Sequence, residues 1–255
     1  MLRNLFGIAG VSFLLIGAPM DAATAADMPL KASLAAPPPS WTGCYIGMNV
    51  GYGWQYNRPF DPTSPTLSVG SDISSGVVGG GQLGCDYQLS SRWVVGVQGM
   101  FDGASVTGSH GVPVAYAGDT GETMSFQTNW LATVTGRIGY AVQPQTLLYV
   151  KGGAAWARID YTDIDLTGIV FTPFAGQASA TPIGWTVGGG LEYAVTRNGS
   201  LFIEYDYADF GSRTVNLTYN CGATCGFTNP YPYQETHRLQ TVLVGLNYRL
   251  GAFGQ

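Results

Sequence analysis

Charged residues are scarce in this sequence, and they form no basic cluster. Asp, Glu, Lys and Arg together make up 11% of the chain, and the formal net charge is −5. Typical soluble domains carry roughly 25% charged residues. Proteins that bind nucleic acid present basic patches, so the composition predicts no nucleic-acid partner.

Long apolar runs are also lacking. The apolar stretch at residues 5–18 is too short for a membrane-spanning helix, which needs roughly 20 such residues. It follows the basic Arg3 and precedes small residues that run through Ala25 and Ala26. This order is typical of a secretory signal peptide. We therefore predict that residues 1–26 are removed on export, with cleavage after Ala25 or Ala26.

The chain beyond the leader has no amphipathic helix of ordinary length. Residues 27–40 are rich in Pro and Ala and predict an extended linker on the periplasmic side. From residue 41 onward, glycines fall inside runs of alternating aromatic and β-branched residues. Their total of 37 in 255 residues is about twice the usual share of roughly 7%. We predict one all-β domain over residues 41–255 and no periplasmic globular domain.

Alternation of apolar and polar residues predicts eight strands. Their approximate ranges are 42–56, 76–89, 92–104, 126–141, 146–159, 182–195, 200–211 and 235–250. Short turns at Ser90–Ser91, 142–145 and 196–199 alternate with long polar connections at 57–75, 105–125, 160–181 and 212–234. This regular alternation is typical of an outer-membrane barrel, whereas a soluble β-sandwich has no reason for it.

The two faces of the predicted strands differ in chemistry. One face is apolar, and the other carries the charged residues. A soluble lipocalin-like barrel would alternate as well, but it would not need aromatic girdles at both strand ends, which match the two membrane interfaces. We therefore predict a closed antiparallel eight-stranded transmembrane β-barrel. The girdle residues are Trp54, Tyr87, Trp93, Phe101, Trp130, Tyr140, Trp156, Trp185, Tyr193, Tyr207 and Tyr248.

Seven charged residues on the other face should point into the barrel. An eight-stranded barrel is just wide enough to be filled by side chains, and buried charges are tolerated only when they are paired. We favour a paired plug in the lower lumen over a path for solutes or protons. Its members are Asp86, Arg137, Lys151, Glu192, Glu204 and Arg249, with Asp206 just above.

The four cysteines predict disulfides, because export delivers the chain to an oxidising compartment. Cys44 and Cys85 should both face outward near the turn rim of neighbouring strands, where they could bridge. Cys221 and Cys225 lie close in sequence and could close a small loop. The alternative is four free thiols, two of them filling lipid-facing positions.

The sequence predicts no catalytic, cofactor-binding or metal site. It has two histidines, and neither belongs to an evident triad with a serine and an acid. The neighbours Ser109 and His110 lie in a stretch expected to be a loop. Asp160, Asp163 and Asp165 could bind a divalent cation, but we favour a solvated acidic loop.

Several motifs resemble one bacterial family. Residues 41–54 read WTGCYIGMNVGYGW and resemble the WTGFYIGxNxGYGW opening of the outer-membrane immunogenic, porin-family proteins of rhizobia and brucellae. Further matches lie at 79–84, 136–141, 148–157, 184–193, 204–211 and 244–249. The chain departs from the family at Cys44 and Cys85, which replace aromatics, and at Leu250, where the family has a terminal aromatic. The resemblance implies an eight-stranded barrel that is abundant at the cell surface and recognised by antibodies.

Two functions follow as hypotheses from these observations. The first is a structural surface protein in the Gram-negative outer membrane, with both termini periplasmic and four long loops outside. The second is a narrow porin-like channel for small solutes. The expected partners are outer-membrane lipid and lipopolysaccharide, the barrel assembly machinery, and host or environmental surface ligands.

Overall fold

The computed structural model describes residues 40–62, 66, 69–113, 121–165, 174–221 and 229–250. The predicted signal peptide, the linker before Ser40, and residues 251–255 lie outside this set. Among the described residues, no helix is long and apolar enough to cross a membrane.

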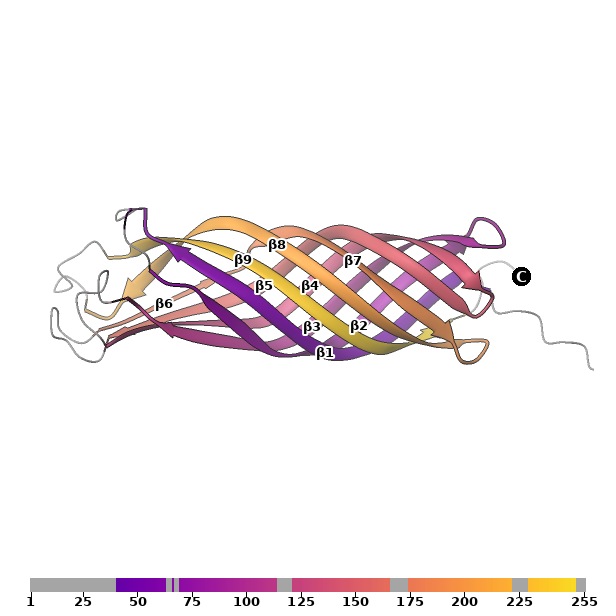
Figure 1. The fold of residues 1–255 in the computed structure, drawn as a ribbon, viewed down its shortest axis with the longest axis horizontal. Coiled ribbons are helices and arrows are strands. Elements are labelled where there is room, and N and C mark those ends of the chain that lie inside the picture. The colour runs from indigo at the N-terminus through magenta and orange to yellow at the C-terminus, as the bar shows by residue number, and fades with distance from the viewer. Residues whose placement is uncertain are drawn as a thin grey trace, which may run out of the picture. The chain divides into compact units, whose positions relative to one another are not determined.

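The described chain is built almost entirely of antiparallel strands (Figure 1). They are β1 (Gly43–Phe60), β2 (Asp72–Gln88), β3 (Trp93–Gly111), β4 (Glu122–Gln143), β5 (Thr146–Asp165), β6 (Phe174–Ala180), β7 (Ile183–Ala194), β8 (Gly199–Tyr219) and β9 (Tyr231–Arg249). Consecutive strands pair from β1 to β6 and from β7 to β9, and β9 returns to pair with β1 along almost its whole length. The sheet therefore closes into a barrel, which leaves no free edge between the first and last strands.

The strands β6 and β7 occupy one position in the ring. Both pair with β5 on one side and with β8 on the other. The break between them falls at Thr181 and Pro182. Proline has no backbone N–H to donate to a ladder, so it interrupts a strand. Counted by position, the ring has eight strands, as predicted.

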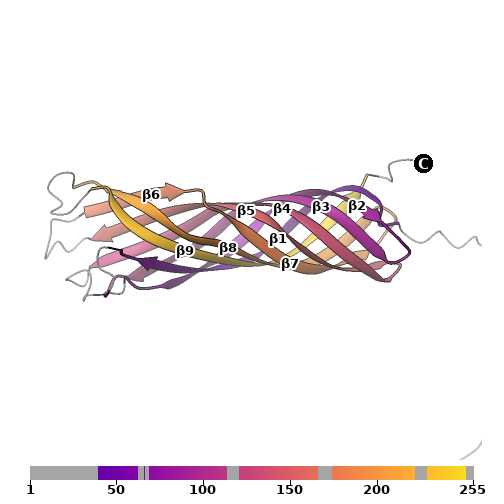
Figure 2. The same cartoon turned by 90° about the horizontal axis from the view of Figure 1, so that it is seen from above.

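The two ends of the barrel differ in their connections (Figures 1 and 2). Residues 89–92, 144–145 and 195–198 make short turns at one end, which we call the turn end. The turns at this end connect β2 to β3, β4 to β5, and β7 to β8. The first strand, β1, also begins at this end, and the last strand, β9, ends there. The opposite end carries the longer connections, and we call it the loop end. The predicted alternation of short and long connections is confirmed.

The strands extend much further toward the loop end than the sequence predicted. Apart from β6 and β7, they contain 17 to 22 residues, about twice the 9–11 needed to cross a membrane. Parts of the predicted connections 57–75, 105–125, 160–181 and 212–234 are therefore strand. The prediction was wrong because many outward residues of these extensions are Ser, Thr, Asn and Gln, a composition that is typical of loops.

The barrel wall reverses its polarity between the two ends. In the half near the turn end, the large exposed side chains are apolar, among them Leu83, Val97, Ile138, Val150 and Leu246. In the half near the loop end, most apolar side chains point inward and form a buried cluster, although Phe60 and Ile73 are exposed. This cluster includes Met124, Phe126, Ile159, Tyr161, Val215, Leu217, Tyr219 and Tyr233.

The reversal follows from what surrounds each half. Lipid outside the turn-end half favours apolar outward residues and leaves the lumen to polar ones. Water outside the loop-end half drives the apolar residues inward, as in a soluble protein core. Among the described residues, the turn-end half thus has the surface of a membrane-spanning barrel, and the loop-end half projects beyond it.

Candidate functional site

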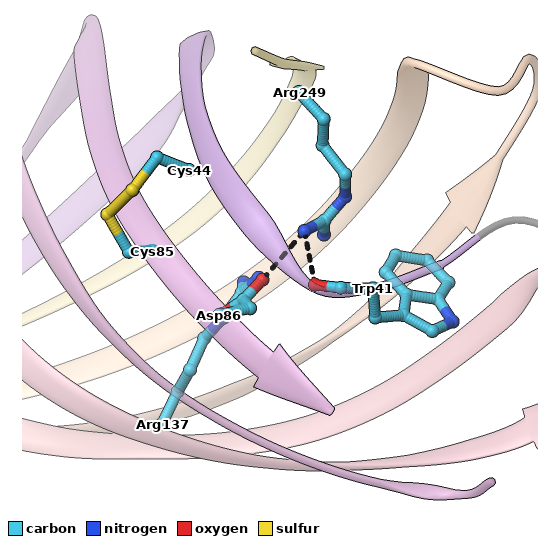
Figure 3. Close-up of a disulfide and its surroundings, with 6 residues drawn as sticks. All are labelled: Trp41, Cys44, Cys85, Asp86, Arg137 and Arg249. Carbon is cyan, nitrogen blue, oxygen red and sulfur yellow. Dashed lines mark hydrogen bonds and ion pairs between the residues drawn. A yellow bond between two sulfur atoms is a disulfide. The ribbon is translucent and has the colours of Figure 1, made fainter. Parts of the chain in front are cut away.

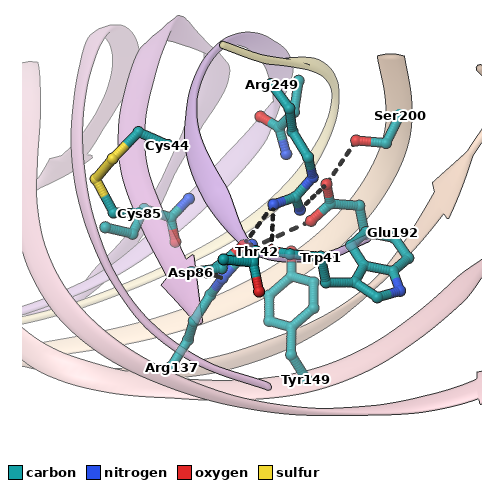
Figure 4. A network of polar contacts seen from close by, with 12 residues as sticks. Trp41, Thr42, Cys44, Cys85, Asp86, Arg137, Tyr149, Glu192, Ser200 and Arg249 are labelled. Atoms are coloured by element: carbon teal, nitrogen blue, oxygen red, sulfur yellow. Dashed lines mark hydrogen bonds and ion pairs between the residues drawn. A yellow bond between two sulfur atoms is a disulfide. The ribbon is translucent and has the colours of Figure 1, made fainter. Parts of the chain in front are cut away.

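Four charged side chains form a closed ring across the lumen near the turn end (Figure 4). Asp86 comes from β2, Arg137 from β4, Glu192 from β7 and Arg249 from β9. Arg137 donates from Nε to Asp86 Oδ1 at 2.7 Å and from Nη1 to Glu192 Oε2 at 3.3 Å. Arg249 donates to Asp86 Oδ2 at 3.1 Å and to Glu192 Oε1 at 3.2 Å. Each guanidinium thus contacts both carboxylates.

The ring is balanced in charge and almost completely removed from solvent. The side chains of Asp86 and Glu192 are 0% exposed, and those of Arg137 and Arg249 are 1% and 7% exposed. Buried ions are expensive unless good geometry and further hydrogen bonds compensate for the lost hydration. Here the alternation of two cations and two anions supplies that compensation. The ring therefore places four paired charges across the lumen with little exposure to solvent.

Aromatic side chains hold the two guanidinium groups from the sides. The ring of Tyr45 lies 4.8 Å from the guanidinium carbon of Arg137 and 5.4 Å from that of Arg249. Tyr149 lies 5.0 Å from Arg137. Such cation–π contacts strengthen when water is excluded. The sequence prediction omitted both tyrosines, although the alternation of β1 places Tyr45 on the inward face.

Trp41 lies beside Arg249 and Asp86 of the ring, at the turn end of the barrel (Figure 3). Its carbonyl oxygen accepts a hydrogen bond of 2.8 Å from Arg249, and its indole N–H donates to the carbonyl of Pro144 at 3.2 Å. The indole is 2% exposed and packs with Val94, Leu147 and other buried residues from the surrounding strands. The residue just after the predicted linker is thus a cap on the turn end of the barrel.

A second, separate cluster lies further inside. Lys151 Nζ is 2.6 Å from Glu204 Oε1 and 3.1 Å from Asp206 Oδ2. The hydroxyl of Tyr149 donates to Glu204 Oε2 at 2.7 Å. The sequence placed Lys151 and Glu204 in one layer with Arg137 and did not distinguish two sets of ion pairs. Arg137 and Lys151 are cross-strand partners, and the two like charges turn toward different carboxylates.

Amide side chains continue the polar filling of the lumen. Gln98 donates to Gln82 at 2.6 Å, and Gln82 donates to Asn247 at 2.6 Å. Asn49 donates to Asp102 at 2.9 Å. All five side chains are buried. The lumen of the membrane-spanning half is therefore filled by side chains from every side of the barrel.

The comparisons with known proteins agree with this architecture. A family model described as the outer membrane protein beta-barrel domain matches residues 22–249. The chain belongs to this family. A 31 kDa outer-membrane immunogenic protein of Brucella melitensis is 33% identical over 216 residues, which cover 82% of this chain and 84% of the relative. A 25 kDa outer-membrane immunogenic protein of Brucella abortus is 27% identical over 182 residues, or 71% of each chain.

Among solved structures, OprG from Pseudomonas aeruginosa aligns with 83% of this chain and 99% of its own, with a TM-score of 0.49 and 10% identity. The predicted family and fold class are confirmed by the family model and the Brucella relatives. The protein is therefore an outer-membrane β-barrel.

Within the described residues, the hydrogen-bond partners of the two histidines are a backbone carbonyl, two amides and a tyrosine. Ser109 and His110 are neighbours in β3, so their side chains point to opposite faces of the wall. His237 is buried in the loop-end half, where its ring nitrogens contact the Tyr161 hydroxyl at 2.7 Å and Asn57 at 2.8 Å.

The three aspartates of the predicted acidic loop belong to strand β5 instead. Asp163 and Asp165 point inward and are buried. Asp160 points outward and pairs with Arg158 at 3.4 Å. The expectation of a solvated loop was wrong because β5 continues to Asp165. In the part of the chain that the structure describes, no group of three His, Cys, Asp or Glu side chains could hold a metal ion.

The disulfide Cys44–Cys85 joins β1 to β2 beside the ring (Figure 3). The two residues face each other directly in the ladder, and the next pair is Gly43 with Asp86. The bond therefore fixes the strand that carries Asp86 to the strand that follows the Trp41 cap. Cys221 is also disulfide-bonded, and its predicted partner Cys225 lies outside the described residues.

Replacing both Cys44 and Cys85 by Ser should lower the free energy of unfolding by about 2–4 kcal/mol, because the bond closes a long loop in the unfolded chain. Urea unfolding of refolded protein in micelles measures this. The double replacement of Cys221 and Cys225 is the control and should cost less, since its loop is short. Non-reducing peptide mapping should recover Cys44 linked to Cys85. A link from Cys44 to Cys221 or Cys225 would contradict the strand assignment.

Proposed function

We propose that this outer-membrane barrel is a closed structural and surface protein rather than an open pore. The observation that carries the proposal is the ring of Asp86, Arg137, Glu192 and Arg249, sealed beneath by Trp41. A solute would have to break several buried ion pairs and displace a packed indole to pass. At the loop end, the apolar interior presents a second obstacle to polar solutes.

The proposal includes an orientation. An even number of strand positions places the start of β1 and the end of β9 at the same end of the barrel (Figure 1). An exported chain that inserts from the periplasm leaves its short turns on that side. The turn end and both termini would then be periplasmic, and the loop end would face outward. The immunogenic names of the Brucella relatives support display of the loop end to antibodies.

Protease applied to intact cells should test the orientation. We expect cleavage only in the connections of the loop end, because the outer membrane shields the turn end. The turns at 89–92, 144–145 and 195–198 should be cut only after the outer membrane is permeabilised. Cleavage of these turns on sealed cells would reverse the orientation.

A narrow channel is the second candidate. Several buried lumen oxygens, among them those of Thr133 and Thr135, have no hydrogen-bond partner within the described residues. Such atoms could line a thin file of water. This observation favours local hydration of the lumen, but the ring and the cap would still block a continuous path.

Conductance of the refolded protein in a planar bilayer separates the two candidates. We expect almost no current through the natural protein, because the ring and Trp41 close the lumen. A mobility difference between boiled and unboiled samples on a gel is the control for folding. Steady openings of porin size would contradict the closed barrel.

A further inference from the structure

The outer wall of the loop-end half carries an ordered strip of polar side chains. Two cross-strand rows run over β3, β4, β5 and β6, as their registers show. The first row is Thr107, Gln127, Asp160 and Ser179. The second row is Ser109, Ser125, Thr162 and Gln177. All eight residues are exposed or half-buried, and we call them the polar strip.

The strip is hollowed and partly held in place by its own hydrogen bonds. A depression of about 470 Å³ is lined by six of the eight residues, with Gly108 and Phe126 in addition. Asn129, beside the strip, accepts from Gln127 at 2.9 Å and donates to Asp160 at 2.6 Å. Ser179 donates to the other oxygen of Asp160 at 2.6 Å. A ligand would therefore meet side chains that are already oriented.

The strip begins just beyond the aromatic girdle. The rings of Phe101 and Trp130 stack on the outer face of β3 and β4, with their centroids 5.7 Å apart. Trp156 of β5 lies in the same cross-strand row as Phe101. Aromatic girdles mark the boundary between the hydrocarbon and the polar headgroups. The polar strip therefore lies at the height of the headgroups, and the girdle residues border it on the membrane side.

The chemistry of the strip selects one kind of partner. Its side chains are hydroxyls and amides with one carboxylate, and the adjacent Arg158 is already paired with that carboxylate. Phosphate recognition relies on Arg and Lys donors, so this face is poorly suited to phosphate. Peptide binding relies on aromatic or Arg anchors, or on free strand edges, and the strands here are paired. Neutral sugar hydroxyls match the strip as both donors and acceptors.

We propose that the polar strip binds the sugar part of the glycolipid in the outer leaflet. This inference rests on the proposed orientation, because only an outward loop end would meet that leaflet. The occupant is a neutral saccharide segment that lies across β3 to β6 with its lipid anchored beside the girdle. Its hydroxyl groups would exchange hydrogen bonds with Gln127, Asp160 and the neighbouring hydroxyls.

The test uses the full protein in micelles and a dephosphorylated core oligosaccharide released from lipopolysaccharide, titrated by NMR. The variant Thr107→Ala/Gln127→Ala should weaken binding roughly tenfold, since it removes two hydrogen-bonding groups from one row. The matched control is Thr214→Ala/Gln234→Ala, an exposed Thr and Gln that face each other on β8 and β9 and belong to neither row of the strip. We expect the control to bind as the natural protein does.

Three outcomes would overturn the inference: no binding by the natural protein, equal weakening in both variants, or binding only by the phosphorylated oligosaccharide. Protein in micelles has no sidedness, so each of these results is independent of the orientation tested with protease. A reversed orientation together with selective sugar binding would leave the strip as a saccharide site and place its ligand on the other side of the membrane.

Discussion

Arg137→Ala should lower the free energy of unfolding by about 3–5 kcal/mol, the usual cost of leaving a buried carboxylate without its partner. The structure identifies the stranded groups as Asp86 and Glu192, which would then share Arg249 alone. The substitution also removes the cation from between Tyr45 and Tyr149. The measurement is the urea midpoint of refolded protein, with the gel mobility shift as the fold readout.

Arg158→Ala is the matched control for Arg137→Ala. Arg158 is also on a barrel strand and pairs with one aspartate at 3.4 Å, but its side chain is 44% exposed. Exposed ion pairs contribute only about 0–1 kcal/mol, so the midpoint should hardly move. Equal effects of the two substitutions would mean that water reaches the ring and solvates each charge separately.

Lys151→Met should have an effect of similar size in the second cluster. Methionine retains the length of the side chain but removes the charge that Glu204 and Asp206 share. Two neighbouring carboxylates would remain in the lumen without a cation, at an expected cost of about 3–5 kcal/mol. The urea midpoint again measures the change.

The triple variant Lys151→Met/Glu204→Gln/Asp206→Asn separates charge from packing. Replacement of a whole buried ion set by neutral groups is often tolerated, and the amide oxygen introduced by Glu204→Gln would still accept the hydrogen bond from Tyr149. We therefore expect the triple variant to recover most of the stability lost in Lys151→Met. A triple variant as unstable as the single one would show that the loss came from packing.

The position of each charged residue on the inner or outer face was predictable from the sequence, but its partner was not. Alternation in a strand has a period of two, so Asp86, Arg137 and Arg249 could be assigned to the lumen from local sequence. On the same grounds, Glu192 and Glu204 were both plausible partners for Arg137. The registers between strands, together with the repulsion between Arg137 and Lys151, decide that Glu204 pairs with Lys151 and not with Arg137.

The extent of the strands shows a second limit of sequence reasoning. The sequence distinguishes an apolar outer face from a polar one wherever lipid surrounds the barrel. Beyond the girdle, as at Asp160 and Thr162 of β5, the outer face is polar and resembles a loop. The inward apolar residues of that half, such as Phe126, come into contact with one another only when the sheet closes into a barrel.

The sequence by itself determined the class of the protein: an antiparallel barrel of eight strand positions with aromatic girdles and an inward set of charges. These properties depend on alternation and composition, which are local and can be read along one strand. The tertiary structure alone decided the closed ring with its Trp41 cap, the separate Lys151 cluster and the reversal of polarity toward the loop end. Each of these features depends on which strands lie side by side, on their register, and on whether lipid or water surrounds them. The residues involved lie far apart in the chain, so no single strand contains this information.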